Sequence, residues 1–318
     1  MSQDVLNQDV LICGSIAFDT IAVFEGRFRD HILAESIKSL SVSFFVPTLR
    51  KEYGGCAGNI AYNLHLLGGR PVPVGTVGAD AEDYVQRMRD LGMDTSLVRV
   101  LPEAYTPQCY ITTDQENNQI ASFHPGAMLR SAENDLSGHA AAWAIVAPDA
   151  KDAMFVHARR LHQAGIPFVF DLGQAMPLFE GPDLQDMLAM ASILTANDYE
   201  ASVIEDRTGR TVQDWSRELQ AVVVTHGARG SVLYVGGEST DIAPVPVSHP
   251  LDPTGCGDAH RAGLLHGLVR GWTLAEACCL ANVMGSLKIM TRGPQNHQPG
   301  QARIVDCLNT HYGLGKSL

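Results

Sequence analysis

Residues 252–259, Asp-Pro-Thr-Gly-Cys-Gly-Asp-Ala, combine two glycines with a carboxylate directly before an apolar helical pattern. The apolar residues that follow recur every three or four positions, which predicts a helix that begins at Gly257. At a helix N-terminus several backbone N–H groups lack an intrahelical partner, and the helix dipole presents partial positive charge. The two glycines leave room for a phosphate-sized anion, so the N–H groups of Gly255, Cys256 and Gly257 are predicted to form an anion hole.

Asp258 is the candidate catalytic group of this stretch. A carboxylate in the first helical turn suits the helix dipole, but here it would also repel a bound phosphate. Its presence is explained if it takes a proton from an attacking hydroxyl group, which is the role of the general base in phosphoryl transfer. A structural interpretation, in which Asp258 only complements the dipole and the glycines only form a tight turn, explains these few residues equally well.

Cys256 offers a second chemistry. A thiol at a helix N-terminus is expected to have a lowered pKa, and His260 follows one turn later, so a cysteine nucleophile with a histidine base is an alternative. No third residue that would orient the histidine is evident. The seven cysteines are odd in number and scattered, which favours free thiols in a reducing cytoplasm and argues against a zinc site.

Length and composition narrow the class of protein. A chain of 318 residues with 45% hydrophobic residues can bury one large core and carry a small additional element. The formal net charge of -12 argues against a nucleic-acid partner. The first residues are polar, without the pattern of a secretory signal, and no apolar run approaches the ~18 residues of a membrane span. We therefore expect a cytoplasmic protein with no membrane partner.

Short apolar runs alternate with helical stretches, which predicts an α/β fold with a doubly wound, mostly parallel sheet flanked by helices. The first run, Val10 to Gly14, is followed by Ser15 and Asp19, whose polar side chains lie at the carboxyl edge of the sheet, where such folds bind ligands. No linker is visible, so residues 1–318 are predicted to form a single domain. Further strands are predicted at 72–77, 143–147, 168–170, 193–195 and 222–225, and a helix at 80–91.

Two insertions, at about residues 20–52 and 106–124, interrupt the alternation. Their β-like runs predict a small lid of strands, and a closed lid would keep water away from a reacting phosphate. The predicted lid strands are Thr20–Phe24, Leu40–Val46, Gln108–Thr113 and Gln119–Phe123.

Residues 252–258 closely resemble the second signature of the ribokinase-like kinases, the phosphofructokinase-B family, usually written Asp-Thr-x-Gly-Ala-Gly-Asp. Residues 54–59, Gly-Gly-Cys-Ala-Gly-Asn, resemble the first signature, Gly-Gly-x-x-x-Asn. The resemblance implies an ATP-dependent kinase with Asp258 as the base. It also implies a sugar site made by Ser15, Asp19, Gly55 and Asn59, in which Asp19 grips two hydroxyl groups and Asn59 bonds a ribose hydroxyl group.

The family resemblance also implies the nucleotide side of the site. Asn197 and Glu200 match an Asn-x-x-Glu pattern that holds Mg²⁺ near the phosphates, although the same residues fit a helix capping box. Residues 225–230 resemble a Thr-x-Gly-x-x-Gly loop under the nucleotide, which assigns ATP contacts to Thr225, Gly227 and Gly230. Asn282 is assigned a further ATP contact, and residues 291–294 match a loop that in some members lies beside K⁺. The glycine-rich lysine motif of P-loop kinases is absent from the sequence.

Within the family, the resemblance is greatest to bacterial adenosine kinases, over most of the chain. It implies that Phe123 stacks on a purine, that Gln174 lies near the base, and that the lid is the candidate interface of a homodimer. Cys56 stands where ribokinase proper has lysine, which favours a nucleoside over a sugar. Cys109 and Ala175 replace a second aromatic residue and a second glutamine, so a kinase that accepts inosine, guanosine or cytidine, a sugar kinase, and a non-catalytic nucleoside-binding regulator remain alternatives.

Overall fold

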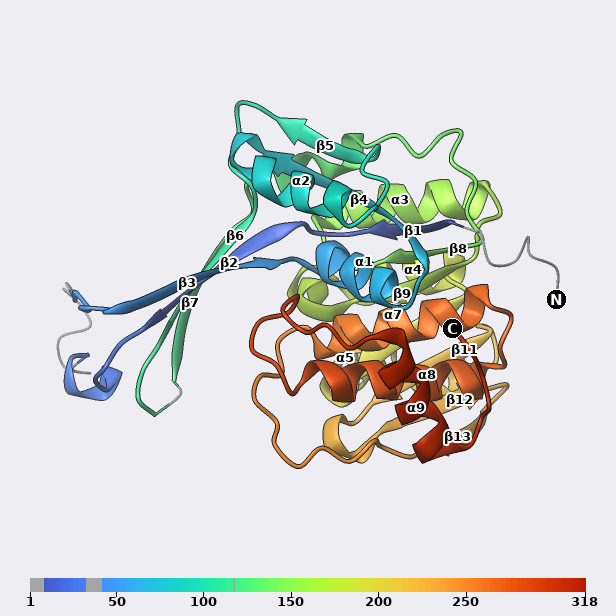
Figure 1. Cartoon of the computed structure of the whole chain (residues 1–318). Helices are drawn as coiled ribbons and strands as arrows, with labels where there is room; N and C mark the ends of the chain where they lie inside the picture. The colour runs from blue at the N-terminus through green and yellow to red at the C-terminus, as the bar shows by residue number, and fades with distance from the viewer. Residues whose placement is uncertain (1–8, 33–41, 117) are drawn as a thin grey trace.

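A nine-stranded sheet forms the centre of the body in the computed structural model, which describes residues 9–32, 42–116 and 118–318 (Figure 1). Seven neighbouring strands of this sheet run parallel to one another, and the last two, at one edge, are antiparallel to their neighbours. The predicted doubly wound, mostly parallel sheet is confirmed. In spatial order the strands are β13 (Glu238–Ile242), β12 (Ser231–Val235), β11 (Ala221–Thr225), β10 (Ile193–Asn197), β9 (Phe168–Asp171), β8 (Trp143–Val146), β1 (Asp9–Cys13), β4 (Arg70–Gly78) and β5 (Val98–Leu101).

Helices cover both faces of this sheet, because successive strand residues point to opposite sides and both sides are apolar. In β1, Val10 and Ile12 join one core, and Leu11 and Cys13 join the other. The first core is covered by α1 (Cys56–Leu66), α2 (Glu82–Asp90), α7 (Cys256–Val269), α8 (Leu274–Lys288) and α9 (Gln301–Tyr312). The second is covered by α3 (Lys151–Gln163), α4 (Gly181–Met190), α5 (Asp198–Thr208) and α6 (Val212–Trp215).

Short 3₁₀ helices lie in the connections between these elements, at Phe28–Asp30, Ala79–Ala81, Gly126–Glu133, Gly173–Leu178 and Gly227–Arg229. None of the helices in the described ranges is long and apolar enough to cross a bilayer.

A separate four-stranded sheet extends from the body as the predicted lid (Figure 1). Its order is β3 (Thr48–Gly54), β2 (Ala17–Val23), β6 (Gln108–Thr113) and β7 (Gln119–His124). Strand β2 pairs antiparallel with β3 and parallel with β6, and β6 pairs antiparallel with β7. The first lid insertion therefore runs from Ala17 to Gly54, and it begins three residues before the predicted boundary.

The predicted strand Leu40–Val46 is wrong where the structure describes it. Residues 40 and 41 lie outside the described ranges, and residues 42–46 form no strand. Phe44 packs on Phe24 and Phe28, with ring centroids 4.9 Å and 5.0 Å apart, so this apolar run contributes to an aromatic cluster. The lid strand is the more polar stretch Thr48–Gly54, which pairs with β2 over its whole length.

Candidate active site

The anion hole is built at the start of α7, which begins at Cys256, one residue before the predicted start. Gly255 is the N-cap with a φ of 78°, a left-handed conformation that favours glycine. A Cβ atom at Gly255 would also lie 2.8 Å from the Cβ atom of Pro294. The N–H group of Cys256 donates to the carbonyl oxygen of Pro253 at 3.1 Å, whereas those of Gly255 and Gly257 have no acceptor among the described residues. These two N–H groups are available to a bound anion.

Asp258 lies in the first turn of α7 and meets α1. Its Oδ2 atom accepts a hydrogen bond from the Nδ2 atom of Asn59 at 2.8 Å, across 199 positions of sequence. Burial raises the pKa of Asp258 to about 7, and the carboxylates of Asp171 and Asp19 add to this shift. The hydrogen bond from Asn59 and the charge of Arg261 oppose the shift. A carboxylate that titrates near neutrality is suited to accept a proton at physiological pH.

Asp19 approaches the same region from the lid strand β2. Its Oδ2 atom would lie 2.6 Å from a Cβ atom at Gly54, so the absence of a side chain there allows the carboxylate to lie against the backbone. Burial raises the pKa of Asp19 to about 6, and the neighbouring carboxylates of Glu52 and Asp252 contribute. The carboxylate of Asp19 thus lies close enough to those of Asp252 and Asp258 for their charges to interact.

Ser15, which follows β1, and Gly55, which precedes α1, lie against each other. The Oγ atom of Ser15 accepts the N–H group of Cys56 at 3.1 Å, and its carbonyl oxygen accepts the N–H group of Ala57 at 2.9 Å. Ser15 therefore caps the N-terminus of α1. Gly55 has a φ of 82°, and its backbone lies directly against Ser15, which leaves no space for a side chain. This packing holds the N-terminus of α1, and with it Asn59, beside Asp258.

Sequence reasoning missed a buried ion pair beside this group. The guanidinium group of Arg261 donates two hydrogen bonds to the Asp171 carboxylate, at 3.0 Å and 2.9 Å, and its Nη2 atom lies 4.0 Å from Glu200. Arg261 stands one turn after Gly257 and also donates to the Gly257 carbonyl oxygen at 3.4 Å. A single arginine on a mostly apolar helix was the available sequence signal for this pair.

Asn197 and Glu200 form the capping box that their spacing allows. The Asn197 Oδ1 atom accepts the Glu200 N–H group, and the Glu200 Oε2 atom accepts the Asn197 N–H group, both at 2.8 Å. The described residues contain no group of three or more His, Cys, Asp or Glu side chains arranged for a metal ion. Mg²⁺ needs few protein ligands when phosphates and water supply the others. The second carboxylate oxygen of Glu200 is a hard oxygen donor of the right type, so these residues fit Mg²⁺.

The other residues predicted to contact ATP lie around the end of β11. Thr225 is in register with Asn197 on the neighbouring strand β10, and its Oγ1 atom donates to the Ala196 carbonyl oxygen at 3.4 Å. Gly227 and Gly230, with φ values of 57° and 90°, form the turn into β12. Asn282 is used in the fold, because its side chain accepts from Ser231 and donates to the carbonyl oxygens of residues 242 and 243.

Phe123 and Asp19 share one face of the lid. Asp19 is in register with Cys109, and Cys109 with Phe123, so the three residues form one row across the sheet. Phe123 is 52% exposed and borders an open cleft of about 910 Å³. Gln174 is exposed on the 3₁₀ helix after β9 and is not among the residues that line this cleft.

The cysteine hypothesis predicted a lowered pKa for Cys256, and that prediction is wrong. Burial raises the pKa of this thiol to about 11, which outweighs its position at the helix N-terminus. Its Sγ atom contacts the carbonyl oxygen of Asp252 at 3.9 Å. Both ring nitrogens of His260 are buried without a hydrogen-bond partner in the described structure, so no Cys256–His260 pair forms.

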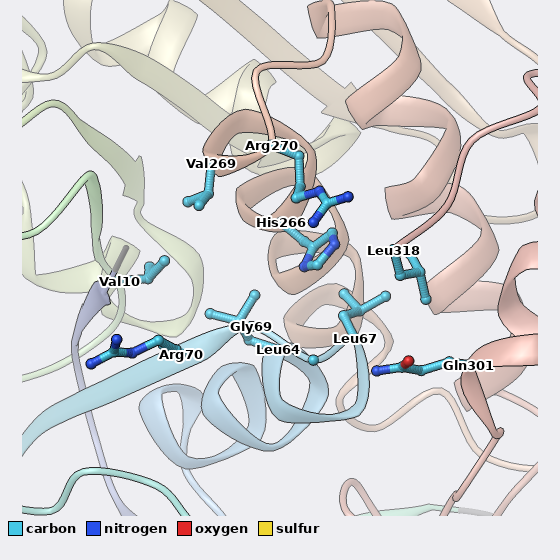
Figure 2. A pocket seen from close by; sticks show the side chains of 11 residues that line it. Val10, Leu64, Leu67, Gly69, Arg70, His266, Val269, Arg270, Gln301 and Leu318 are labelled. Carbon is cyan, nitrogen blue, oxygen red and sulfur yellow. The ribbon is translucent and has the colours of Figure 1, made fainter. Parts of the chain in front are cut away.

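A second cavity, of about 230 Å³, lies away from these residues (Figure 2). It is lined at the start of β1 and β4 and at the C-terminal ends of α1 and α7, whereas the anion hole lies at the opposite end of α7. None of the predicted site residues lines it.

The model of the pfkB family of carbohydrate kinases matches residues 19–300 of this chain. The chain belongs to this family and is a phosphotransferase. The match includes the anion hole and nearly all of both lid insertions, which agrees with the predicted ribokinase-like fold.

Proteins of known function share the whole architecture. A nucleoside kinase of Burkholderia thailandensis, solved in complex with inosine, is 46% identical, with a TM-score of 0.87, and the match covers 96% of this chain and 98% of that one. The nucleoside kinase of Methanocaldococcus jannaschii is 25% identical in its solved structure, with a TM-score of 0.88, and the match covers 96% of this chain and 99% of that one.

Proposed function

We propose that this enzyme transfers the γ-phosphoryl group of ATP to the 5′-hydroxyl group of a nucleoside, with adenosine as the expected substrate. The observation that carries the proposal is the hydrogen bond between Asn59 and Asp258, which joins the candidate ribose site on α1 to the anion hole on α7. A nucleoside held by Asp19 and Asn59 would present its hydroxyl group to a carboxylate with a near-neutral pKa. The relative from B. thailandensis, which was solved with inosine, supports this substrate class.

In the proposed reaction, Asp258 accepts the proton of the 5′-hydroxyl group as its oxygen forms a bond to the γ-phosphorus atom of ATP. The bond between that phosphorus atom and the bridging oxygen of ADP breaks, and ADP leaves. The N–H groups of Gly255 and Gly257 donate to the oxygens of the transferring group, where negative charge is concentrated. The lid, which carries Asp19 and Phe123, excludes water that would otherwise compete with the substrate hydroxyl group.

The nucleotide side of the proposal uses Asn197, Thr225, Gly227 and Gly230 to hold ATP, with Asn282 as a further contact. The ADP–inosine complex of the B. thailandensis relative supports an adenine nucleotide as the second ligand. Glu200 would hold Mg²⁺ or one of its water ligands, and the ion would neutralise charge on the phosphates. Arg261 keeps the carboxylates of Asp171 and Glu200 in place on the protein side.

A broader base specificity is the second candidate, and the inosine bound to the B. thailandensis relative favours it. Phe123 offers a flat apolar face that any base can use. The amide of Gln174 carries both a donor and an acceptor, so it can serve the amino group of adenine or the oxo group of hypoxanthine. Cys109 beside Phe123 is smaller than an aromatic residue and leaves space for other bases, such as guanine and cytosine.

We also propose that two copies associate through the lid, in a cytoplasmic protein. Leu49 and Ile120, which are 66% and 42% exposed, lie at the two ends of one row across the sheet, with Ala22 and Thr112 between them. Ala22 is three residues from Asp19, so this row lies on the face opposite the site row. Light scattering should give the mass of a dimer, and Ile120→Lys should give the mass of a monomer. A monomeric parent protein would contradict the proposal.

The test of the proposed activity is a comparison of kcat/KM for adenosine, inosine, 2′-deoxyadenosine, ribose and fructose with ATP. We expect adenosine and inosine to exceed the free sugars by a wide margin, because a sugar leaves Phe123 unused. We expect 2′-deoxyadenosine to be poor, because Asp19 or Asn59 would then be buried without its hydroxyl partner. Ribose or fructose equal to adenosine would overturn the nucleoside assignment.

A further inference from the structure

Lys288, the last residue of α8, has no exposed surface (0%). Lysine side chains are almost never fully buried unless their charge has a partner. Here the Nζ atom donates to two backbone carbonyl oxygens, those of Asp252 at 2.8 Å and Thr291 at 3.2 Å. No carboxylate oxygen of the described chain lies within 4.0 Å of this nitrogen. The ammonium group is therefore held chiefly by main-chain oxygens.

The two carbonyl oxygens belong to the segments that support the anion hole. Residues 251–255 lead into α7 and residues 289–294 follow α8, and these segments are joined by several further contacts. The Asp252 Oδ2 atom accepts the Gly293 N–H group at 2.8 Å, and the Leu251 N–H group donates to the Ile289 carbonyl oxygen at 2.8 Å. Lys288 lies at the centre of this junction, so its position affects that of Gly255 at the start of α7.

The charge of Lys288 also acts on the anion hole. It lowers the pKa of Cys256, the first residue of α7, although burial raises that pKa overall. Burial lowers the pKa of Lys288, and the charges of Cys256, Asp252 and Asp258 oppose this effect. A cation at this depth adds positive potential where a phosphate would bind.

Backbone carbonyl oxygens that converge on one cation are also the ligands that proteins use to replace the water shell of K⁺. The loop at 291–294, which resembles the loop that lies beside K⁺ in some relatives, here points its Thr291 carbonyl oxygen at an ammonium group. We propose that Lys288 is a positioning residue whose ammonium group takes the place of a monovalent metal ion between the two segments, so that the enzyme needs no K⁺. The catalytic part of this inference rests on the proposed function, and its structural part does not.

The first experiment uses the unaltered protein, dialysed into tetramethylammonium chloride, with K⁺ or Na⁺ added at constant ionic strength. We expect kcat and the thermal midpoint to be the same in all three salts, because the site already holds its cation and ionic strength is matched. A kcat that requires K⁺, or a midpoint that K⁺ alone raises, would overturn the proposal.

The second experiment compares Lys288→Ala, which leaves space between the carbonyl oxygens, with Lys288→Met, which fills that space with an uncharged chain. We expect kcat to fall in both, on the order of 10²-fold if the anion hole shifts by about 1 Å. K⁺ or NH₄⁺ should raise both the thermal midpoint and the kcat of Lys288→Ala, but neither quantity in Lys288→Met, since only a binding ion stabilises the folded state. Lys316→Ala, at a partly exposed ion pair with Glu276, is the matched control and should behave as the parent.

The thermal midpoint separates this inference from the proposed function, because it needs no turnover. A folded Lys288→Ala protein whose midpoint responds equally to K⁺ and to tetramethylammonium would refute the cation role, whatever its activity. If Lys288→Ala does not fold, the ion comparison on the unaltered protein decides the question. If K⁺ specifically raises the thermal midpoint of Lys288→Ala and the parent protein phosphorylates no nucleoside, the cation role of Lys288 is supported and the proposed function is refuted.

Discussion

Replacing Arg261 with methionine should destabilise the fold, because the substitution removes one partner of a buried ion pair. Arg261 donates two hydrogen bonds to Asp171, which is only 3% exposed, so the substitution leaves a buried carboxylate without its cation. Methionine keeps much of the apolar stem, which limits the loss of packing. Removing one partner of a buried pair costs about 3–5 kcal/mol. We expect urea unfolding to show a loss of this size, and the double variant Asp171→Leu/Arg261→Met to recover much of it.

The same substitution should change the pH dependence of activity. Arg261 lowers the pKa of Asp258, so its loss should raise that pKa above about 7 and move the acidic limb of the kcat profile to higher pH. Asp171→Asn should move the limb the other way, because the Asp171 carboxylate raises the pKa of Asp258. A destabilisation under about 1 kcal/mol, the range of exposed pairs, would refute the stability argument. An unmoved limb, or two shifts of the same sign, would refute the electrostatic one.

Three further outcomes follow from the site. Cys256→Ala should keep near-parental kcat, because the Cys256 thiol takes no part in the proposed reaction, and loss of activity would restore the cysteine hypothesis. Phe123→Ala should raise KM for nucleosides by the equivalent of ~1 kcal/mol with little effect on KM for ATP, and an unchanged nucleoside KM would remove the stacking role. The pKa of Asp258 rises from 3.8 to about 7 on folding, so its contribution to stability is full below pH 3.8 and is lost as the pH rises through about 7. Activity should rise as the pH rises through about 7, and Asp258→Asn should flatten the pH dependence of both activity and stability by comparison with the parent.

The central sheet could be predicted from sequence because its strands are short apolar runs buried on both faces. The strands that escaped prediction are partly exposed. Strand β3, Thr48–Gly54, carries charged residues on a lid that contacts little of the body, whereas the apolar residues just before it pack as an aromatic cluster. Strand β13, Glu238–Ile242, lies at the sheet edge and is exposed along most of its length. Apolar patterns indicate burial, and these strands are defined by backbone pairing instead.

The candidate site was predictable where glycines and polar residues recur in known motifs, as at Gly255, Gly257 and Asp258. The buried charges were not, because their partners are distant in sequence or are backbone atoms. Arg261 pairs with Asp171, 90 positions away, and Lys288 with the carbonyl oxygen of Asp252, 36 positions away. A single sequence shows neither the burial of such a side chain nor its partner. The spacing of Asn197 and Glu200 predicted their mutual capping because that interaction is local.

The most direct test of the account is the kcat of Asp258→Asn, which keeps the size of the side chain and removes its ability to accept a proton. Asp83→Asn is the matched control, since Asp83 is an exposed carboxylate in the first turn of α2. We predict that calorimetry will show both variants binding adenosine and ATP, and that only Asp258→Asn will lose turnover, by ~10²- to 10⁴-fold. A kcat for Asp258→Asn within a fewfold of the parent would contradict the assignment of Asp258 as the general base.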